Sequence, residues 1–281
     1  MRHAYLILAH NEPAILKMLV SLLDSDENDF FIHIDKKVDI EDFKDIKTKC
    51  SKIIFTNRID VRWGNVSQIE AEYILFETAF SLDKYDYFHL LSGVDLPIKS
   101  KAYINEFFEK NAGKEFVDIW PVKKSELYNK CLCYNFFTSR IHVGGGYSCM
   151  VKILRHLLCP IQKVVGIRRK YPFELYKGAN WVSITNKFCE YLLSMKEVIL
   201  KSFRYTVCGD EIFLQSILMS SDFKKNLYLG NMRFANWKGG NSPQNFEMCD
   251  LNKLSTSNCL FARKFSSTST ELLEKLKNIT R

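Results

Sequence analysis

The chain has 281 residues, of which 47% are hydrophobic and 26% are charged, an ordinary composition for a soluble globular protein of one large α/β domain or two smaller ones. No apolar run reaches about 18 residues, so no transmembrane helix is expected. Nine scattered cysteines without a C-x-x-C pair argue against a zinc or thioredoxin-type site and are typical of reduced thiols, while the net charge of +8 favours an anionic partner.

The N-terminal half alternates short apolar strands with helical patterns. In chain order, the spacing predicts a strand at 4–10, a helix at 12–24, strands at 30–35 and 52–56, a helix at 66–82, a strand at 87–92, a helix at 101–110 and a strand at 115–120. The start, MRHAYLILAHNE, has no cleavage site of small residues and is interpreted as the first strand. This order of elements predicts a mainly parallel sheet with helices on both faces.

The pattern weakens in the C-terminal half. Residues 121–176 are basic, aromatic and interrupted by glycine. After them the sequence predicts a strand at 180–185, helices at 186–195 and 208–221, a loop-like tail at 230–265 and a last helix at 267–279.

The stretch HLLSGVDLPIKS at 89–100 is an apolar strand that stops at Ser92-Gly93 and turns at Pro97. It is either a tight turn or the wall of a pocket, because ligands of open α/β sheets bind outside the carboxyl ends of the strands. The stretch CGDEIFLQSIL at 208–218 also has two interpretations. Asp210 is a candidate helix N-cap, and Glu211 is a candidate general base; spacing alone favours the capped helix.

Two basic spots lie in the tail. Lys238 stands beside two glycines in NWKGGNSP, and Arg263 and Lys264 lie between aromatic residues in LFARKF. Glycines let a backbone approach a ligand closely, and Lys and Arg among apolar neighbours can hold an anion such as a diphosphate. The alternative is a solvated basic loop.

Taken together, these segments resemble the Core-2/I-branching glycosyltransferase family, which includes the peptide O-xylosyltransferases. The resemblance runs in register over nearly the whole chain. Its most specific part is HLLSGVDLPIKS; the others are AYLILAHNE, FFIHIDKKVD, RWGNVS, GANWVSIT, CGDEIFLQSIL, NMRFANW and LFARKF. The chain departs from the family where Cys208-Gly209 replaces Ser-Pro before Asp210, so a more flexible loop is expected there.

The resemblance implies a GT-A fold over a single catalytic domain, 1–281. Within it we expect a nucleotide-sugar-binding half at 1–120, a basic insertion at 121–176, and an acceptor and diphosphate-binding half at 177–281. It implies inverting transfer from a UDP-sugar, with Glu211 as catalytic base. The donor would contact Ala9, Asp35, Arg62, Trp63, Lys238, Arg263 and Lys264, and the reacting sugar or acceptor would contact Asp95, Asn180, Trp181 and Asp210.

No metal or other cofactor is expected. Many GT-A enzymes hold a metal with an Asp-x-Asp motif at the end of a central strand, but the corresponding SGVDLP has Asp95 alone. The literal Asp24-Ser25-Asp26 lies in a polar turn and is expected to be solvated. We expect the cations of the tail to meet the charge of the leaving UDP instead.

The segment 148–172 has a basic amphipathic pattern broken by Pro160. It is either an ordinary helix with a solvated basic face or a peripheral contact with an anionic membrane. Its basic residues are Lys152, Arg155, His156, Lys163, Arg168, Arg169 and Lys170. Since no anchor or disulfide signature is present, a bacterial cytoplasmic member is expected. If 148–172 is a membrane contact, it would lie on the inner face of the cytoplasmic membrane.

The acceptor is expected to be a glycan or lipid-linked glycan, and N-acetylglucosamine is favoured as the donor sugar over xylose or galactose. A more distant alternative is a non-catalytic protein that binds anions or nucleic acid. The sequence contains no RNA-binding motif, so no nucleic-acid partner is expected.

Overall fold

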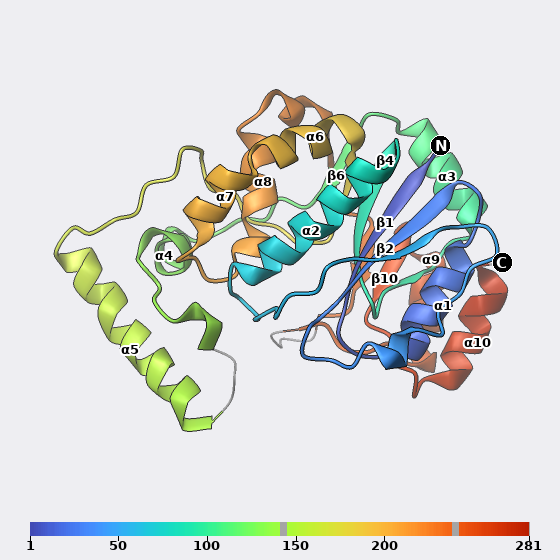
Figure 1. Ribbon diagram of the computed structural model, residues 1–281, viewed down its shortest axis with the longest axis horizontal. Helices are drawn as coiled ribbons and strands as arrows, with labels where there is room; N and C mark the ends of the chain where they lie inside the picture. The colour runs from blue at the N-terminus through green and yellow to red at the C-terminus, as the bar shows by residue number, and fades with distance from the viewer. Residues whose placement is uncertain (141–144, 238–241, 281) are drawn as a thin grey trace.

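The computed structural model describes residues 1–140, 145–237 and 242–280 (Figure 1). Within them a seven-stranded sheet has the order β3-β2-β1-β4-β7-β6-β8. The strands are β1 (His3–Ala9), β2 (Asn28–Ile34), β3 (Ile53–Phe55), β4 (Tyr87–Ser92), β6 (Glu115–Val117), β7 (Ser183–Thr185) and β8 (Leu227–Leu229). Only β7 among these strands runs antiparallel to its neighbours. The predicted fold class, an α/β fold with a mainly parallel central sheet flanked by helices, is confirmed.

Both faces of the sheet are covered, as the alternation of β1 requires. Tyr5 and Ile7 face one apolar core, and Ala4 and Leu6 face the other. The first core is covered by α1 (Pro13–Leu23), α3 (Lys101–Lys110), α9 (Leu251–Thr256) and α10 (Thr270–Ile279). The second is covered by α2 (Ser67–Leu82), α6 (Asn186–Ser194), α7 (Lys196–Phe203) and α8 (Phe213–Met219). Figure 1 shows the two groups on opposite sides of the strands.

The prediction that 230–265 is loop-like is wrong. This tail contains α9 and two strands, β9 (Arg233–Ala235) and β10 (Phe261–Arg263), which form a three-stranded sheet with β5 (Leu96–Pro97) in the order β5-β10-β9. Strands of two or three residues whose partners are remote in the chain leave no periodicity to detect. The helix α7 was missed as well, and the strands expected at 115–120 and 180–185 are only three residues long.

The basic insertion is built from α4 (Lys124–Leu127), a π-helical turn (Tyr128–Leu132) and α5 (Gly145–Val164). The expected break at Pro160 is wrong, because α5 continues through it to Val164. Figure 1 shows α5 at one end of the molecule, away from the central sheet. Across the described part of the chain, no helix combines the length and the apolar content needed to cross a membrane.

Among the described residues, short 3₁₀ turns lie at Glu41–Phe43, Thr138–Arg140, Gly209–Glu211, Asp222–Asn226 and Met248–Asp250. All nine cysteines are free.

The junction of β7 and α6 carries a testable interaction. Thr185 Oγ1 donates to the buried carboxylate of Glu115 over 2.6 Å and accepts the N–H of Phe188, which caps α6. Thr185→Ala removes the cap and one donor of a buried carboxylate, so we expect a loss of about 2–4 kcal/mol in unfolding free energy by urea denaturation. Ser221→Ala removes a cap without a buried carboxylate and is expected to cost about 1 kcal/mol or less. Equal losses would contradict this role of Thr185.

Candidate active site

Three strand ends meet at the carboxyl edge of the main sheet. The N–H of Asp35 donates to Ala9 O over 2.9 Å, and the N–H of Gly93 donates to Leu8 O over 2.8 Å. A Cβ at Gly93 would lie 2.6 Å from that of Ala9, closer than real side chains come. The Ser92-Gly93 exit is therefore required by the close approach of two backbones, and it lies where open α/β sheets bind ligands.

Asp95 is fully buried directly after this exit. Its carboxylate accepts the N–H of Ser92 over 3.1 Å and the Ser92 hydroxyl, and it lies 3.2 Å from Nε of Arg263. The Arg263 guanidinium stacks over the ring of Trp181, 4.4 Å from its centre. Asp95 therefore fixes both the loop at the end of β4 and the cation of β10, and three residues predicted for the site lie in one cluster.

The donor-side residues of the N-terminal half form a chain of ion pairs. Lys37 Nζ lies 2.7 Å from the Asp35 carboxylate and 2.8 Å from that of Asp60. Arg62 Nε donates to Asp60 over 2.8 Å. Asp35 and Arg62 are thus linked through Lys37 and Asp60, which the sequence did not single out.

A hollow of about 470 Å³ lies around Glu211. It is lined by Trp63, Trp120, Lys130, Lys177, Cys208, Glu211 and Trp237. Glu211 Oε2 lies 3.4 Å from Lys130 Nζ and 3.7 Å from Lys177 Nζ, and the Glu211 side chain is 32% exposed. A carboxylate held between two ammonium groups, and open to a space walled by indole rings, has the geometry of a base for a bound hydroxyl.

The backbone around Gly178 positions this carboxylate. The N–H of Gly178 donates to Glu211 O over 2.9 Å, and a Cβ at Gly178 would lie 1.8 Å from Asp118 O. The N–H of Trp120 donates to Lys177 O over 2.7 Å, which brings Trp120 and Lys177 to the same wall. The glycine of the GANW segment is therefore a packing requirement beside the candidate base.

Asp210 is not the predicted N-cap of α8, because a 3₁₀ turn precedes that helix and Ile212 occupies the cap position. Asp210 is buried, and its Oδ2 accepts Gln68 Nε2 over 3.0 Å. Burial and the charge of Glu211 raise the pKa of Asp210 to about 7. Behind it lies the fully buried Glu72, whose pKa is raised well above its ordinary value by burial and by Asp210, and which the Asn180 amide approaches.

Two other basic residues of the tail, Lys238 and Lys264, were predicted to contact the donor. Lys238 lies outside the described residues. Lys264 Nζ contacts Ser242 Oγ at 3.3 Å, and burial together with the charge of Arg263 lowers the pKa of Lys264.

Sequence reasoning missed several members of the site. Trp120, Lys130, Lys177 and Trp237 line the hollow, and Gln68 and Glu72 lie behind it. Lys177 and Trp237 directly precede the segments GANW and KGG, so proximity to those motifs could have marked them. Lys130 lies in the basic insertion, where no local pattern distinguishes it from its neighbours.

Within the residues that the structure describes, no group of three or more His, Cys, Asp or Glu side chains could hold a metal ion. The Asp-x-Asp stretch has another role at its first position. The Asp24 carboxylate accepts the backbone N–H groups of Lys49, Cys50 and Ser51, at 2.6, 3.1 and 2.9 Å. Asp24 anchors a loop and is not simply a solvated turn residue.

Comparison with known proteins identifies one enzyme family and several of its glycosyltransferases. The model of the Core-2/I-Branching enzyme family matches residues 3–258. A xylosyltransferase of Ciona intestinalis is 22% identical over 95% of this chain and 32% of its own length. Xylosyltransferase 2 of Rattus norvegicus and of Homo sapiens are each 24% identical over 98% of this chain and 33% of their own length. The chain thus spans about a third of the length of these relatives.

Among solved structures, an active-site mutant of LgtC covers 99% of this chain and 95% of its own, with 12% identity and a TM-score of 0.39. A likeness this distant carries no argument about the site.

The Asp95–Arg263 pair predicts an asymmetry between two arginines. Arg263→Met leaves the Asp95 carboxylate buried without its cation, and we expect a loss of about 3–5 kcal/mol in unfolding free energy. Arg62→Met breaks a pair whose two side chains are 36% and 40% exposed, and we expect a change within about 1 kcal/mol. Urea denaturation measures both, and adding Asp95→Asn to Arg263→Met should recover part of the loss. Equal costs for the two arginines would contradict the importance of burial here.

The raised pKa of Asp210 predicts a pH dependence of stability. In the unfolded chain an aspartate titrates near pH 4, whereas the folded state keeps the Asp210 proton up to about pH 7. The stability contributed by this group is therefore complete below about pH 4 and is lost as the pH rises to about 7. Asp210→Asn should reduce the fall in unfolding free energy over this range by about 2–4 kcal/mol. Asp222→Asn, at an exposed carboxylate, should leave the fall unchanged; identical pH profiles for both variants would exclude this origin.

Proposed function

Because the chain belongs to the Core-2/I-branching enzyme family, we propose that it is an inverting glycosyltransferase that moves a sugar from a UDP-sugar to a hydroxyl of a glycan acceptor. The glycosyltransferase class rests on the family match and on the xylosyltransferase relatives. The observation that supports the mechanism is the Glu211 carboxylate, which lies in a hollow of tryptophans between Lys130 and Lys177.

The proposed reaction is a direct displacement. The acceptor hydroxyl attacks the anomeric carbon of the donor, the bond to the UDP oxygen breaks with its electron pair, and the hydroxyl proton passes to Glu211. The two lysines hold the carboxylate in place at 3.4 and 3.7 Å, distances that leave its oxygens able to accept another donor. The indole rings of Trp63, Trp120 and Trp237 offer flat apolar faces to sugar rings.

On the donor side, we propose that Ala9 and Asp35 contact the uridine, with Arg62 and Trp63 beside them. Lys238, Arg263 and Lys264 would balance the charge that develops on the diphosphate. Arg263 is already engaged by Asp95 and Trp181, so Lys264 is the described tail cation that is better placed to move toward a phosphate. Asp95, Asn180, Trp181 and Asp210 would position the reacting sugar or the acceptor.

We propose that catalysis needs no metal or other cofactor. Asp95, the carboxylate at the strand end, is fully buried and held by Ser92 and Arg263. Recruiting it as a metal ligand would require breaking that pair. Asp24 is likewise held by three backbone N–H groups.

N-acetylglucosamine is the donor sugar that we propose, and xylose is the alternative that the named relatives favour; galactose is the third candidate. We place the reaction in the cytoplasm of a bacterium, in the synthesis of surface polysaccharide or glycolipid. The acceptor would be a glycan or a lipid-linked glycan, with 148–172 against the inner face of the membrane.

The test is release of UDP from UDP-N-acetylglucosamine, UDP-xylose and UDP-galactose, without acceptor and in the presence of EDTA. Slow hydrolysis of one donor should survive EDTA, and Glu211→Gln should lower it by about 10²–10⁴-fold because water loses its base. Glu126→Gln is the matched control, since Glu126 contacts the same two lysines at 3.1 and 2.6 Å but does not line the hollow. It should retain most of the rate.

Activity that disappears with EDTA would overturn metal independence, and an equal loss in both variants would overturn the role of Glu211. Thermal unfolding distinguishes the class of protein: UDP should raise the midpoint of the wild type and of Glu211→Gln, whereas oligonucleotides should not. Stabilisation by oligonucleotides alone would favour the alternative of a non-catalytic nucleic-acid-binding protein.

A further inference from the structure

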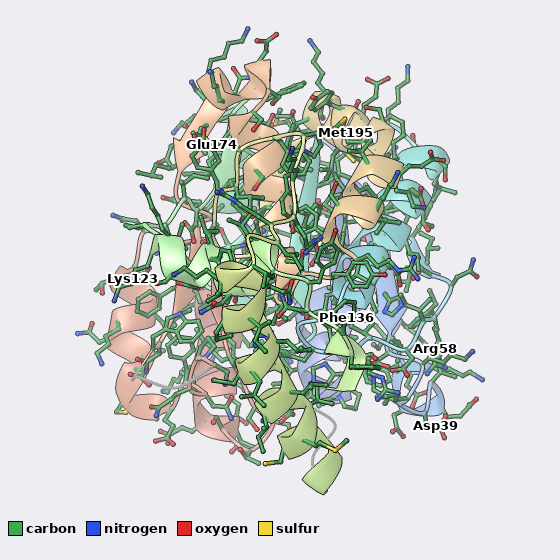
Figure 2. All side chains as sticks on the ribbon, turned by 90° about the vertical axis from the view of Figure 1, so that its left-hand side faces the viewer. Asp39, Arg58, Lys123, Phe136, Glu174 and Met195 are labelled. Carbon is green, nitrogen blue, oxygen red and sulfur yellow. The ribbon has the colours of Figure 1, made fainter. Side chains whose placement is uncertain are left out.

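The helix α5 carries an apolar stripe that no described part of the chain covers. Its exposed members, with exposed fractions of 55–86%, follow the helical spacing of one face: Met150, Ile153, Leu157, Ile161 and Val164. The opposite face is buried and contains Val151, Cys159 and Gln162. Figure 2, which views the molecule from the side where α5 lies, shows this helix in front of the remaining elements.

Polar contacts fix which face of α5 points outward. The Gln162 side chain accepts the N–H of Tyr134 over 2.7 Å and donates to its carbonyl over 3.1 Å. Arg155 Nε donates to Asn135 Oδ1 over 2.6 Å, and its Nη2 donates to Asn129 O over 3.2 Å. Because these bonds hold the inner face against 129–135, the stripe cannot turn inward without breaking them.

The charge of the protein is concentrated in the same segment. Residues 127–173 contain eight Lys and Arg and no Asp or Glu, so this segment accounts for the whole net charge of +8. The rest of the chain is electrically balanced, with 32 basic and 32 acidic residues. On α5, Lys152, His156 and Lys163 share the spacing of one row, which flanks the apolar stripe. Beyond its end, Arg168 and Lys170 are also exposed.

Arg169 does not belong to this surface, which corrects the expectation from the sequence. It is buried, and its Nη1 donates to Cys131 O over 2.8 Å and to Thr206 Oγ1 over 3.1 Å. Arg155 is likewise engaged with the body of the insertion. Among the arginines and lysines expected at 148–172, the ones available to a partner are therefore Lys152, Lys163, Arg168 and Lys170.

We propose that this face of α5 docks on an anionic phospholipid surface, with the stripe in the boundary of the acyl chains and the four exposed cations at the headgroups. An aliphatic stripe with a basic flank matches that surface in both polarity and charge. A second copy of the chain would bring two segments of the same +8 charge together, and aliphatic side chains offer nucleic-acid bases no ring on which to stack.

Docking in this way would also orient the hollow. The π-helical turn 128–132 lies directly under α5 through the contact of Arg155 with Asn129 O, and the same turn supplies Lys130 to the wall of the hollow. The acceptor class that follows, a glycan whose lipid anchor is in that membrane, deepens and rests on the proposed function. The docking itself does not require catalysis.

The experiment is co-sedimentation with phosphatidylcholine vesicles that contain or lack phosphatidylglycerol. The wild type should bind the anionic vesicles at least tenfold more tightly than the neutral ones, and added salt should weaken this binding. Replacing Lys152, Lys163, Arg168 and Lys170 with Gln should reduce binding to the anionic vesicles at least tenfold. Replacing Ile153, Leu157 and Ile161 with Ser should reduce it similarly, since the buried face of α5 is untouched.

The matched control replaces four exposed lysines elsewhere, Lys17, Lys47, Lys224 and Lys277, with Gln. It changes the net charge equally and should retain most of the vesicle binding. Equal losses in the control and in the α5 charge variant would overturn a specific docking face, as would absence of wild-type binding to anionic vesicles. The rise in unfolding midpoint with UDP is measured on every variant, so failure of docking is distinguished from misfolding and from failure of the proposed function.

Discussion

The buried pair of Asp95 and Arg263 joins the two sheets of this protein. Asp95 follows the central strand β4, and Arg263 belongs to β10 of the small sheet, which pairs with β5 just beyond Asp95. A fully buried carboxylate is costly unless a cation and hydrogen-bond donors accompany it, so the end of β4 acquires its stable form only when the tail has returned. The same return places Arg263 on Trp181 and connects the exit of β4 to the loop that leads toward Glu211.

The parts of the fold that could be predicted are those whose information is local. β1, β2 and β4 are six or seven residues long and apolar, and α1 and α2 show helical spacing, so each is visible in a short window. The prediction of a loop-like tail at 230–265 is wrong because β9 and β10 have only three residues each. They form strands through their pairing with each other and, for β10, with β5. The predicted break at Pro160 does not occur. Side-chain contacts of Gln162 and Arg155 hold α5 in place, so the helix tolerates the one backbone hydrogen bond that the proline removes.

The residues of the candidate site also fall into two groups, those that sequence motifs mark and those that only the folded structure brings together. Glu211 and Trp63 lie in recognisable segments, and the structure brings both to one hollow. Lys130 and Lys177 reach that hollow from a π-helical turn and from a loop held against Trp120, and neither placement can be inferred from residue spacing. The N-cap interpretation of Asp210 is wrong because it places the start of α8 two residues too early. The 3₁₀ turn Gly209–Glu211 precedes the helix, and it follows Cys208, which has a left-handed conformation.

Burying ionisable side chains beside Glu211 costs the fold free energy. Glu72 and Asp210 are buried directly behind Glu211, and burial raises the pKa of both. In the part of the chain that the structure describes, neither Glu72 nor Asp210 forms an ion pair, whereas the more exposed Glu126 contacts two lysines. An arrangement optimised for stability alone would pair or remove the buried carboxyls. Among the residues that the structure describes, Glu211 is the carboxylate that lines the hollow. Buried carboxyls directly behind it lower the stability of the fold, a cost that the proposed role of Glu211 as a base would explain, and the uncovered stripe of α5 is a second cost of the same kind.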